Sequence, residues 1–424
     1  MLDIKLIREN PDLVKESARK KRIDVDVGAL LALDVRVRAL KTEVEGVRAR
    51  KNEASGRIQK LSGDEKTAAI AAMKEAGARE KEAAAELKVA EEELRKLMLL
   101  VPNVCGPEVP EGKDESENVP VRHWGEPPKF AFTPLDHVAL GERLDVVDIG
   151  RGVKLSGARS YVLKGDGALL EMAILAYATE MIVARGFVPM LVPHLVKEEA
   201  MVGTAYYPGG EEQAYQAERD GLSLIGTSEV PVTSYHMDEI LTEAELPKLY
   251  AGISPCYRRE AGTYGKDTKG LYRIHQFSKV EQVVVCKADP DESLRFHHLI
   301  LQNAEDLVKS LGIPYRVVAV CGGDLGRPQV AKYDIECWMP SRGGYGETHS
   351  ASRFHDFQAR RLNLRYRDAS GTVRFAHTLN NTLVASPRIF ISILECFQRE
   401  DGCVTIPEPL QKWMGGREAI VPRT

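Results

Sequence analysis

The 424-residue sequence predicts an α+β protein: a part that contains β-strands and helices, preceded by an antiparallel two-helix coiled-coil arm. Two observations predict this fold. Apolar residues recur with heptad spacing between residues 30 and 97, as they do in paired helices. Between residues 312 and 361, short apolar strands alternate with glycine turns, and the stretch 257–281 is typical of a charged strand–loop–strand hairpin.

The heptad pattern consists of two runs separated by Ser62-Gly63-Asp64, which are residue types that stop and cap helices. Two such runs joined by a short turn predict an antiparallel helical hairpin over about residues 28–100. At 1.5 Å per residue, each helix would reach roughly 45–50 Å. The core positions of the first run include Leu30, Leu33, Val37, Leu40, Val44, Val47 and Lys51, and those of the second include Glu80, Ala83, Leu87, Ala90 and Leu94.

Outside its seam, the first heptad run is basic. One interpretation is a solvated coiled-coil surface with interhelical ion pairs. The other is a surface for an RNA backbone, where lysine and arginine displace counterions from phosphates. The candidate RNA-binding residues are Arg36, Arg38, Lys41, Arg48 and Lys51.

Composition divides the chain into an N-terminal domain over residues 1–105, a Pro/Gly-rich linker over 106–125 and a C-terminal domain over 126–424. The net charge of -4 means that any nucleic-acid surface must be a local patch. The seven cysteines form no CxxC pair or zinc-like spacing, so free thiols and no structural zinc are expected. We find no apolar run long enough to span a membrane and no signal peptide, and therefore predict a cytoplasmic enzyme with no membrane partner.

The hairpin 257–281 begins with Tyr257-Arg258-Arg259-Glu260 and ends with GKDTKGLYRIHQFSKVE. Arginines suit phosphate, and glutamates on the same face accept from an amine or a hydroxyl. This segment resembles motif 2 of the class II aminoacyl-tRNA synthetases, and its amino-acid sequence is similar to that of the seryl-tRNA synthetase family. The resemblance extends from MLDIKLIRENPDLVKES at the N-terminus to VTIPEPLQKWMGG near the C-terminus.

The resemblance implies that the C-terminal domain is an antiparallel β-sheet flanked by helices. It also implies roles for the residues of motif 2. Arg258 would hold both the α-phosphate of ATP and the carboxylate of serine, and Glu281 would bind the serine hydroxyl and amine. Lys266, Lys269 and Arg273 would meet phosphate or the tRNA acceptor end. The ATP-binding residues expected here are Arg258, Arg259, Glu260, Arg273, Ile274 and Phe277.

Two upstream segments resemble the same family. Helix 166–185, with Asp166 as N-cap and Gly186 as stop, and the following strand with Pro193 are similar to motif 1, which implies a homodimer interface. Proline places that strand at a sheet edge. Thr227, Ser228 and Glu229 resemble a loop over the amino-acid substrate, and Thr227 or Ser228 would cap a helix running through Tyr235 to Leu241.

Two downstream segments resemble the parts of the site that bind magnesium, ATP and serine. In Glu347-Thr348-His349-Ser350, Glu347 and Ser350 match positions that hold Mg²⁺ on ATP, with Thr348 and His349 beside the nucleotide. Arg388 matches the motif 3 arginine over the γ-phosphate and adenine, and Asn380 and Thr382 match serine-pocket positions. The chain departs from the family pattern at Thr348, His349, Ala351, Arg353, Pro387 and Ile389.

The function implied is activation of L-serine with ATP and transfer of serine to serine tRNA, and to selenocysteine tRNA where one is present. Arg258 and Arg388 would be the catalytic residues, and the arm would grip the long variable arm of the tRNA. Three alternatives remain: an enzyme that loads serine onto a carrier, a catalytically silent tRNA-binding protein, and a specialised or inhibitor-resistant second copy. The silent protein would be expected to lack Arg258, Glu347 or Arg388, and all three are present.

Overall fold

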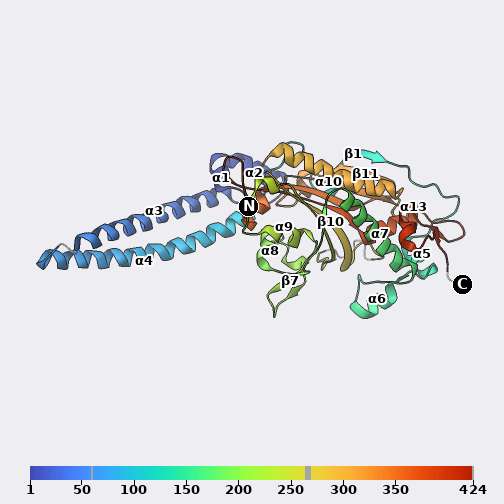
Figure 1. Cartoon of the computed structure of the whole chain (residues 1–424), viewed down its shortest axis with the longest axis horizontal. Coiled ribbons are helices and arrows are strands. Elements are labelled where there is room, and N and C mark those ends of the chain that lie inside the picture. The colour runs from blue at the N-terminus through green and yellow to red at the C-terminus, as the bar shows by residue number, and fades with distance from the viewer. Residues whose placement is uncertain (59–60, 263–268, 423–424) are drawn as a thin grey trace. The chain divides into compact units, whose positions relative to one another are not determined.

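A computed structural model describes residues 1–58, 61–262 and 269–422 (Figure 1). The chain forms two compact units. The first contains residues 1–19 and 23–102, and the second contains residues 20–22 and 103–424.

The first unit is helical, with α1 (Ile4–Glu9) and α2 (Pro11–Lys20) ahead of two long helices, α3 (Val27–Ile58) and α4 (Gly63–Leu100). The long helices lie side by side, which confirms the predicted arm (Figure 1). Heptad positions Val37, Leu40 and Ala90 are buried between them. At 1.5 Å per residue, the 32 residues of α3 and the 38 of α4 span about 48 and 57 Å.

The second unit is built on an eight-stranded sheet in which neighbouring strands are antiparallel, except for one parallel pair at the edge. This arrangement confirms the predicted fold class. The strand order is β1 (Val119–Trp124), β11 (Tyr315–Ala319), β12 (Ala331–Met339), β13 (Gly344–His355), β16 (His377–Ala385), β10 (Gln276–Cys286), β9 (Lys248–Tyr257) and β4 (Val188–Leu191).

The two edge strands bear on the sequence predictions. β4, which contains Pro189, lies at the sheet edge as expected for a strand with proline, although it ends before Pro193. β1 lies inside the stretch 106–125 that composition marked as linker, and it pairs with β11. Part of the expected linker is therefore a strand of the sheet.

Three helices cover the sheet: α7 (Asp166–Ala184), α10 (Pro290–Ser310) and α12 (Ser386–Cys396). α10 packs on β13 and β16, and α12 packs on β12. The core between helices and strands includes the buried residues Ile300, Leu379 and Phe390. This core holds the central strands β13, β16, β10 and β9 in one rigid layer, and the candidate site is built on these strands.

α7 differs from the sequence analysis in two respects. Asp166 is its first residue and Gly165 precedes it as the N-cap, whereas Gly186, at φ 86°, does end the helix as expected. Among the described residues, α7 is also long and apolar enough to cross a membrane, so the expectation that no run reaches that length is wrong. One side of α7 joins the core through Leu170, Ile174, Ala178 and Ile182, which explains its apolar composition in a sheet-covering helix.

The helix expected to run through Tyr235 to Leu241 is much shorter. α9 spans Glu229–Thr233, and a single 3₁₀ turn, Ser234–His236, follows it. Residues Ile240–Thr242 instead form strand β8, which pairs in parallel with β14 (Arg365–Arg367). Pairing with a distant strand thus overrides local helix propensity here.

We predict that Gly252→Ala lowers the melting temperature. A Cβ atom at Gly252 of β9 would lie 2.6 Å from Ser228 Cβ and 2.8 Å from Val232 Cγ2, so α9 would have to move. The free energy of unfolding should fall by about 1–3 kcal/mol, as it does in other overpacked cores. Gly150→Ala in α6 (Ile149–Ser156) is the control, because its Cβ would approach only Asp148 Oδ1, at 3.8 Å. Equal melting temperatures for Gly252→Ala and Gly150→Ala would contradict the prediction.

Candidate active site

The predicted site residues gather around the end of the β9–β10 hairpin. Tyr257 pairs with Gln276 at the last rung of the ladder, and the chain then leaves the sheet. A cavity of about 180 Å³ opens beside this end of the hairpin. It is lined by ten predicted residues: Arg258, Glu260, Arg273, Ile274, Phe277, Glu347, Thr348, Ser350, Thr382 and Arg388.

Two arginines define the cationic part of this cavity. The Arg258 guanidinium lies 5.3 Å from the centre of the Phe277 ring, and its Nε donates to Gly226 O at 3.2 Å. The Arg388 guanidinium lies 4.4 Å from the centre of the Tyr272 ring and donates to Glu347 O at 2.7 Å. Two fixed guanidinium groups facing one cavity make a site for a polyanion.

The cavity continues into two neighbouring hollows. One, of about 360 Å³, shares Arg258, Glu260 and Arg273 with it. The other, of about 390 Å³, shares Tyr272, Arg273, Glu347 and Arg388. Together they provide room on both sides of the arginines for a ligand with several phosphate groups.

A β-bulge brings Glu347 and Ser350 together. β13 pairs with β12, but the register shifts so that Ile335 faces His349 and Glu336 faces Glu347. The extra residue, Thr348, lets side chains three positions apart share a face. Glu347 Oε1 lies 3.5 Å from Ser350 Oγ.

These two side chains have the chemistry of a hard-cation site. The Ser350 hydroxyl donates its proton to Asp334, the residue opposite it on β12, so its oxygen lone pairs remain available. Lys332 Nζ lies 3.3 Å from the other oxygen of Asp334. Among the described residues, no group of three His, Cys, Asp or Glu side chains could hold a metal alone. A carboxylate and a hydroxyl therefore fit Mg²⁺ that shares its remaining positions with phosphates and water.

A second group of side chains lies deeper, between β10, β16 and α9. Lys279 Nζ donates to Thr227 Oγ1 at 2.6 Å and lies 2.5 Å from Glu281 Oε2. Thr382 Oγ1 donates to the same Glu281 oxygen at 3.2 Å. All four side chains are buried, so this is a compact polar pocket inside the core.

Glu229 adds a second carboxylate to this pocket. Burial, and then the charge of Glu281, raise the pKa of Glu229 to about 7. Gln358 Nε2 donates to Glu229 Oε1 at 2.7 Å, and Thr378 Oγ1 donates to Gln358 Oε1 at 2.7 Å. Thr378 and Asn380 lie on the same face of β16 as Thr382, because successive side chains in a strand alternate between faces.

Three predicted residues are placed away from the cavity. The buried Ser228 hydroxyl bonds to Ser254 Oγ at 2.8 Å and to Gly252 O at 3.3 Å, toward β9. Arg259 is exposed and donates to Glu212 O at 3.4 Å. His349 is buried, with its Nδ1 2.7 Å from Thr348 Oγ1, and burial lowers its pKa to about 3. Lys266 lies outside the described residues.

Sequence reasoning missed Tyr272, Lys279 and Asp334, which contact the predicted residues. Lys279 had a usable signal, because it stands two positions before Glu281 on the same strand face. Tyr272 was an aromatic residue one position before Arg273. Asp334 had no local signal, since its partner Ser350 lies 16 positions away on another strand.

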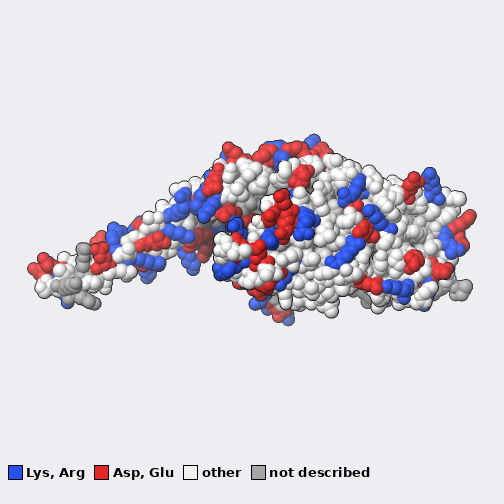
Figure 2. Space-filling view, turned by 45° about the horizontal axis from the view of Figure 1, so that its top comes forward, with Lys and Arg blue, Asp and Glu red and all other residues white. Residues whose placement is uncertain are grey.

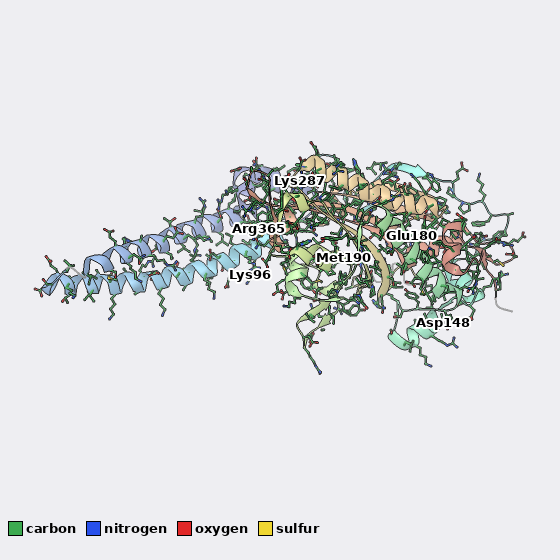
Figure 3. All side chains as sticks on the ribbon, in the orientation of Figure 1. Lys96, Asp148, Glu180, Met190, Lys287 and Arg365 are labelled. Carbon is green, nitrogen blue, oxygen red and sulfur yellow. The ribbon has the colours of Figure 1, made fainter. Side chains whose placement is uncertain are left out.

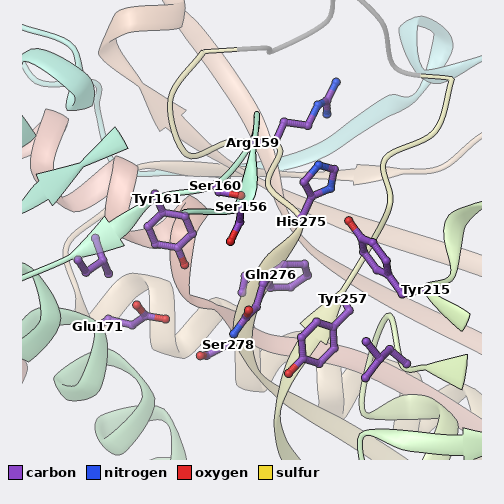
Figure 4. Close-up of a pocket in the computed structure, with 13 residues that line it drawn as sticks. Ser156, Arg159, Ser160, Tyr161, Glu171, Tyr215, Tyr257, His275, Gln276 and Ser278 are labelled. Atoms are coloured by element: carbon purple, nitrogen blue, oxygen red, sulfur yellow. The ribbon is translucent and has the colours of Figure 1, made fainter. Parts of the chain in front are cut away.

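A larger cavity, of about 520 Å³, lies between α6, the start of α7 and the ends of β9 and β10 (Figure 4). Ser156, Tyr161 and Glu171 contribute to it from one side, and Tyr257 and Gln276 from the other. Of the predicted site residues, only Phe277 lines it. Cavity size alone would therefore have pointed away from the place where the arginines and carboxylates meet.

On the arm, the five predicted RNA-binding residues take part in ion pairs. Arg36, Lys41 and Arg48 reach Glu86, Glu91 and Glu80 of α4 at 3.9, 2.8 and 2.9 Å. Lys51 lies 2.6 Å from Glu80 as well, and Arg38 lies 3.2 Å from Asp34 on its own helix. Figure 2 shows the two signs of charge interspersed along this arm.

Comparison with known proteins agrees with this geometry. Residues 1–105 match the seryl-tRNA synthetase N-terminal domain, and residues 213–397 match the tRNA synthetase class II core domain (G, H, P, S and T). The serine–tRNA ligases of Deinococcus radiodurans and Rubrobacter xylanophilus are 46% and 42% identical to the chain, over 99% and 100% of its length and 99% of theirs.

Solved structures extend the likeness to three dimensions. Seryl-tRNA synthetase from Pyrococcus horikoshii, complexed with ATP, superposes with a TM-score of 0.93 at 39% identity and full coverage of both chains. The cytoplasmic serine–tRNA ligase from Naegleria fowleri, in complex with AMP, gives 0.89 at 32% identity, covering 100% of this chain and 99% of that one. With its whole length matched in sequence and in structure, the chain belongs to the seryl-tRNA synthetase family of class II aminoacyl-tRNA synthetases.

Proposed function

We propose that this protein is a serine–tRNA ligase that activates L-serine with ATP and transfers the seryl group to the 3′ end of serine tRNA. One observation carries the assignment: Arg258, Glu347 and Arg388 line a single cavity that also reaches Thr382, at the edge of the buried polar pocket. A catalytically silent tRNA-binding protein would not need to hold this set together. Family membership and the match over the whole chain support the same activity.

In the first step, the serine carboxylate attacks the α-phosphate of ATP, giving seryl-adenylate and pyrophosphate. The carboxylate is itself the nucleophile, so no protein base is required. Arg258 holds both anions, and Arg388 lies across the γ-phosphate and adenine, with Phe277 and Ile274 on the adenine ring. Catalysis is therefore positioning together with electrostatic stabilisation of the charge that grows on the phosphate.

Glu347 and Ser350 would hold Mg²⁺ together with the phosphates. The ion offsets phosphate charge when it is bound. Asp334 keeps the Ser350 oxygen available by accepting its proton. Thr348 lines the same cavity and completes the bulge, and Glu260 accepts from the adenine amine once it releases Arg273, which lies 3.3 Å away in this structure.

Serine is selected in the buried pocket. The Thr227 hydroxyl already accepts from Lys279 Nζ and from Glu229 N, so Glu229 is the acceptor that we assign to the serine ammonium group. Glu281 accepts from the serine hydroxyl, with Thr382 and Asn380 beside it on β16. Alanine would leave the buried Glu281 carboxylate without a hydroxyl partner, so alanine should bind more weakly than serine.

We place tRNA on the helical arm within the N-terminal domain 1–105. Arg36, Arg38, Lys41, Arg48 and Lys51 must exchange their carboxylate partners for phosphate. α4 adds a stripe of exposed cations at heptad spacing, Lys74, Lys81, Lys88 and Arg95, for which no ion pair exists within the described chain. Seven-residue spacing keeps these four on one face of a coiled coil.

We propose that the chain acts as a homodimer. The sides of α7 and β4 that do not enter the core expose apolar groups: Met172 is 65% exposed, Val188 54% and Leu191 85%. Met190 lies on the same strand (Figure 3). Large apolar side chains exposed on two neighbouring elements in this way mark a candidate protein–protein contact.

The proposed location is the cytoplasm. All seven cysteines are free, and five are buried, which suits a reducing compartment. The relative from Naegleria fowleri is described as cytoplasmic.

The first experiment is amino-acid-dependent exchange of pyrophosphate into ATP. We expect serine to drive exchange and alanine, threonine and cysteine not to. Arg258→Ala should lower the rate by about 100-fold or more, the scale seen when a group that stabilises transition-state charge is removed. Arg374→Ala, at an exposed pair with Asp368, is the matched control. Folded protein that shows no exchange with any amino acid would refute the assignment and favour the silent tRNA-binding protein.

The second prediction concerns pH. Below pH 7 the Glu229 carboxyl of the free protein is protonated, with Glu281, Lys279, Arg258 and Tyr206 as the charged or titratable groups around it. A neutral carboxyl pairs poorly with an ammonium group, so kcat/KM for serine should fall about tenfold per pH unit below 7.

Glu229→Gln provides the control for this pH prediction. In the variant, kcat/KM for serine should no longer fall below pH 7. Any pH dependence that comes from the ionisation of ATP should persist in both proteins. An unchanged acid limb in Glu229→Gln would show that another group is responsible.

The third prediction concerns the arm. Neutralising Lys74, Lys81, Lys88 and Arg95 to Gln should weaken tRNA binding and reduce the slope of log K against log salt by roughly 3, since each phosphate contact contributes about 0.7–0.9. Neutralising Arg36, Arg38, Lys41 and Arg48 should change the slope less, because their ion pairs are lost together with their phosphate contacts. Filter binding over a salt series measures both, and exchange without tRNA should be unaffected. Equal slopes in the wild type and the α4 variant would show that the four α4 cations do not contact tRNA phosphates.

A further inference from the structure

Lys279 is a buried cation in the middle of the polar pocket, and only 4% of it is exposed. It stands two positions before Glu281 in β10, so both side chains leave the strand on the same face. Its ammonium donates to Thr227 Oγ1 and lies 2.5 Å from Glu281 Oε2. A lysine is almost never buried without such partners, and here both belong to the proposed serine pocket.

The two oxygens of Glu281 are used differently. Oε2 takes both Lys279 Nζ and the Thr382 hydroxyl, at 2.5 and 3.2 Å. Within the described residues, no donor bonds to Oε1. Oε1 is not one of the fully buried side-chain atoms that lack a partner in the described residues, so this oxygen is open to the pocket, and a ligand that brings a hydroxyl to it would form a hydrogen bond there.

We propose that Lys279 is a specificity-determining positioning residue, which holds Glu281 by one oxygen so that the other faces the hydroxyl of serine. This inference rests on the proposed function. It assigns to Lys279 no contact with the reacting atoms. It also explains why Thr227 belongs to the pocket although its hydroxyl is already used: Thr227 fixes the ammonium that fixes Glu281.

Two other roles for Lys279 make different predictions. As a direct partner of the substrate carboxylate or the α-phosphate, it would strengthen binding of serine and alanine ligands equally. As a neutralising charge and no more, it would be replaceable by any cation. Positioning, in contrast, depends on the shape of the donor, because an ammonium is a point donor and a guanidinium is a fork that grips both oxygens of a carboxylate.

Lys279→Arg separates these possibilities. It keeps the charge beside Glu281, so the pocket is not left with an uncompensated carboxylate, and it brings a fork able to occupy Oε1 as well as Oε2. Lys279→Met removes charge and donor together. Lys287→Met, at the end of β10 beside Glu243, is the control for a lysine outside the pocket (Figure 3).

The probes are the non-hydrolysable sulfamoyl analogues of seryl- and alanyl-adenylate, which differ by one hydroxyl, with dissociation constants from calorimetry and melting curves for folding. For Lys279→Arg and Lys279→Met, we expect the seryl analogue to bind about 10- to 100-fold more weakly, which is the loss expected for one buried hydrogen bond. The dissociation constant of the alanyl analogue should change by less than about threefold, because this analogue has no hydroxyl to lose a contact with Glu281. In exchange assays, KM for serine should rise more than kcat falls, and KM for ATP should stay constant.

Four outcomes decide the matter. A collapse of the seryl-to-alanyl affinity ratio in Lys279→Arg supports positioning, even if Lys279→Met fails to fold. Equal weakening of both analogues, or a raised KM for ATP, overturns it in favour of direct contact. Wild-type selectivity in Lys279→Arg overturns it in favour of charge alone. If the wild-type protein binds neither analogue and shows no serine-dependent exchange, the proposed function itself has failed.

Discussion

Strand β10 is the element on which the site depends, because it is paired on both sides. β9 and β16 hold it in register, with Gly252 opposite Glu281 on one side and Thr382 opposite it on the other. A slip of one residue would turn Lys279 and Glu281 to the opposite face of the sheet. The large core under this strand therefore fixes the position of the Glu281 carboxylate, to which we assign the selection of serine.

Local irregularities adapt this regular sheet to chemistry. The register of β10 against β16 shifts between Val280 and Glu281, and that of β12 against β13 shifts at Ile335. The second shift brings Glu347 and Ser350 to one face. It also explains how the departures from the family pattern at Thr348 and His349 are accommodated: their side chains bond to each other, while the two oxygen donors keep their place.

The fold was largely predictable because its signals are periodic. Heptad spacing defined α3 and α4, whereas the edge position of β4 was expected from Pro193, which lies beyond the end of that strand. The charged residues of the β9–β10 hairpin were recognisable as a set, but the direction of each side chain was not. Glu260 adopts φ 52° just after Arg259, and this turn sends one toward the cavity and the other toward Glu212. Ser228 and Asp334 depend on partners from other strands, which no local pattern reveals.

The arm illustrates how a charged surface can serve two purposes. Four of its α3 cations are paired across the hairpin, but exposed pairs of this kind are each worth only about 0–1 kcal/mol. Exchanging a carboxylate for a phosphate therefore costs little and releases counterions from the nucleic acid. The α4 stripe requires no exchange at all, so it would attract RNA at long range before the α3 cations change partners. In the sequence of events that we propose, the ion pairs stiffen the free hairpin, and their cations then become part of the RNA-binding surface.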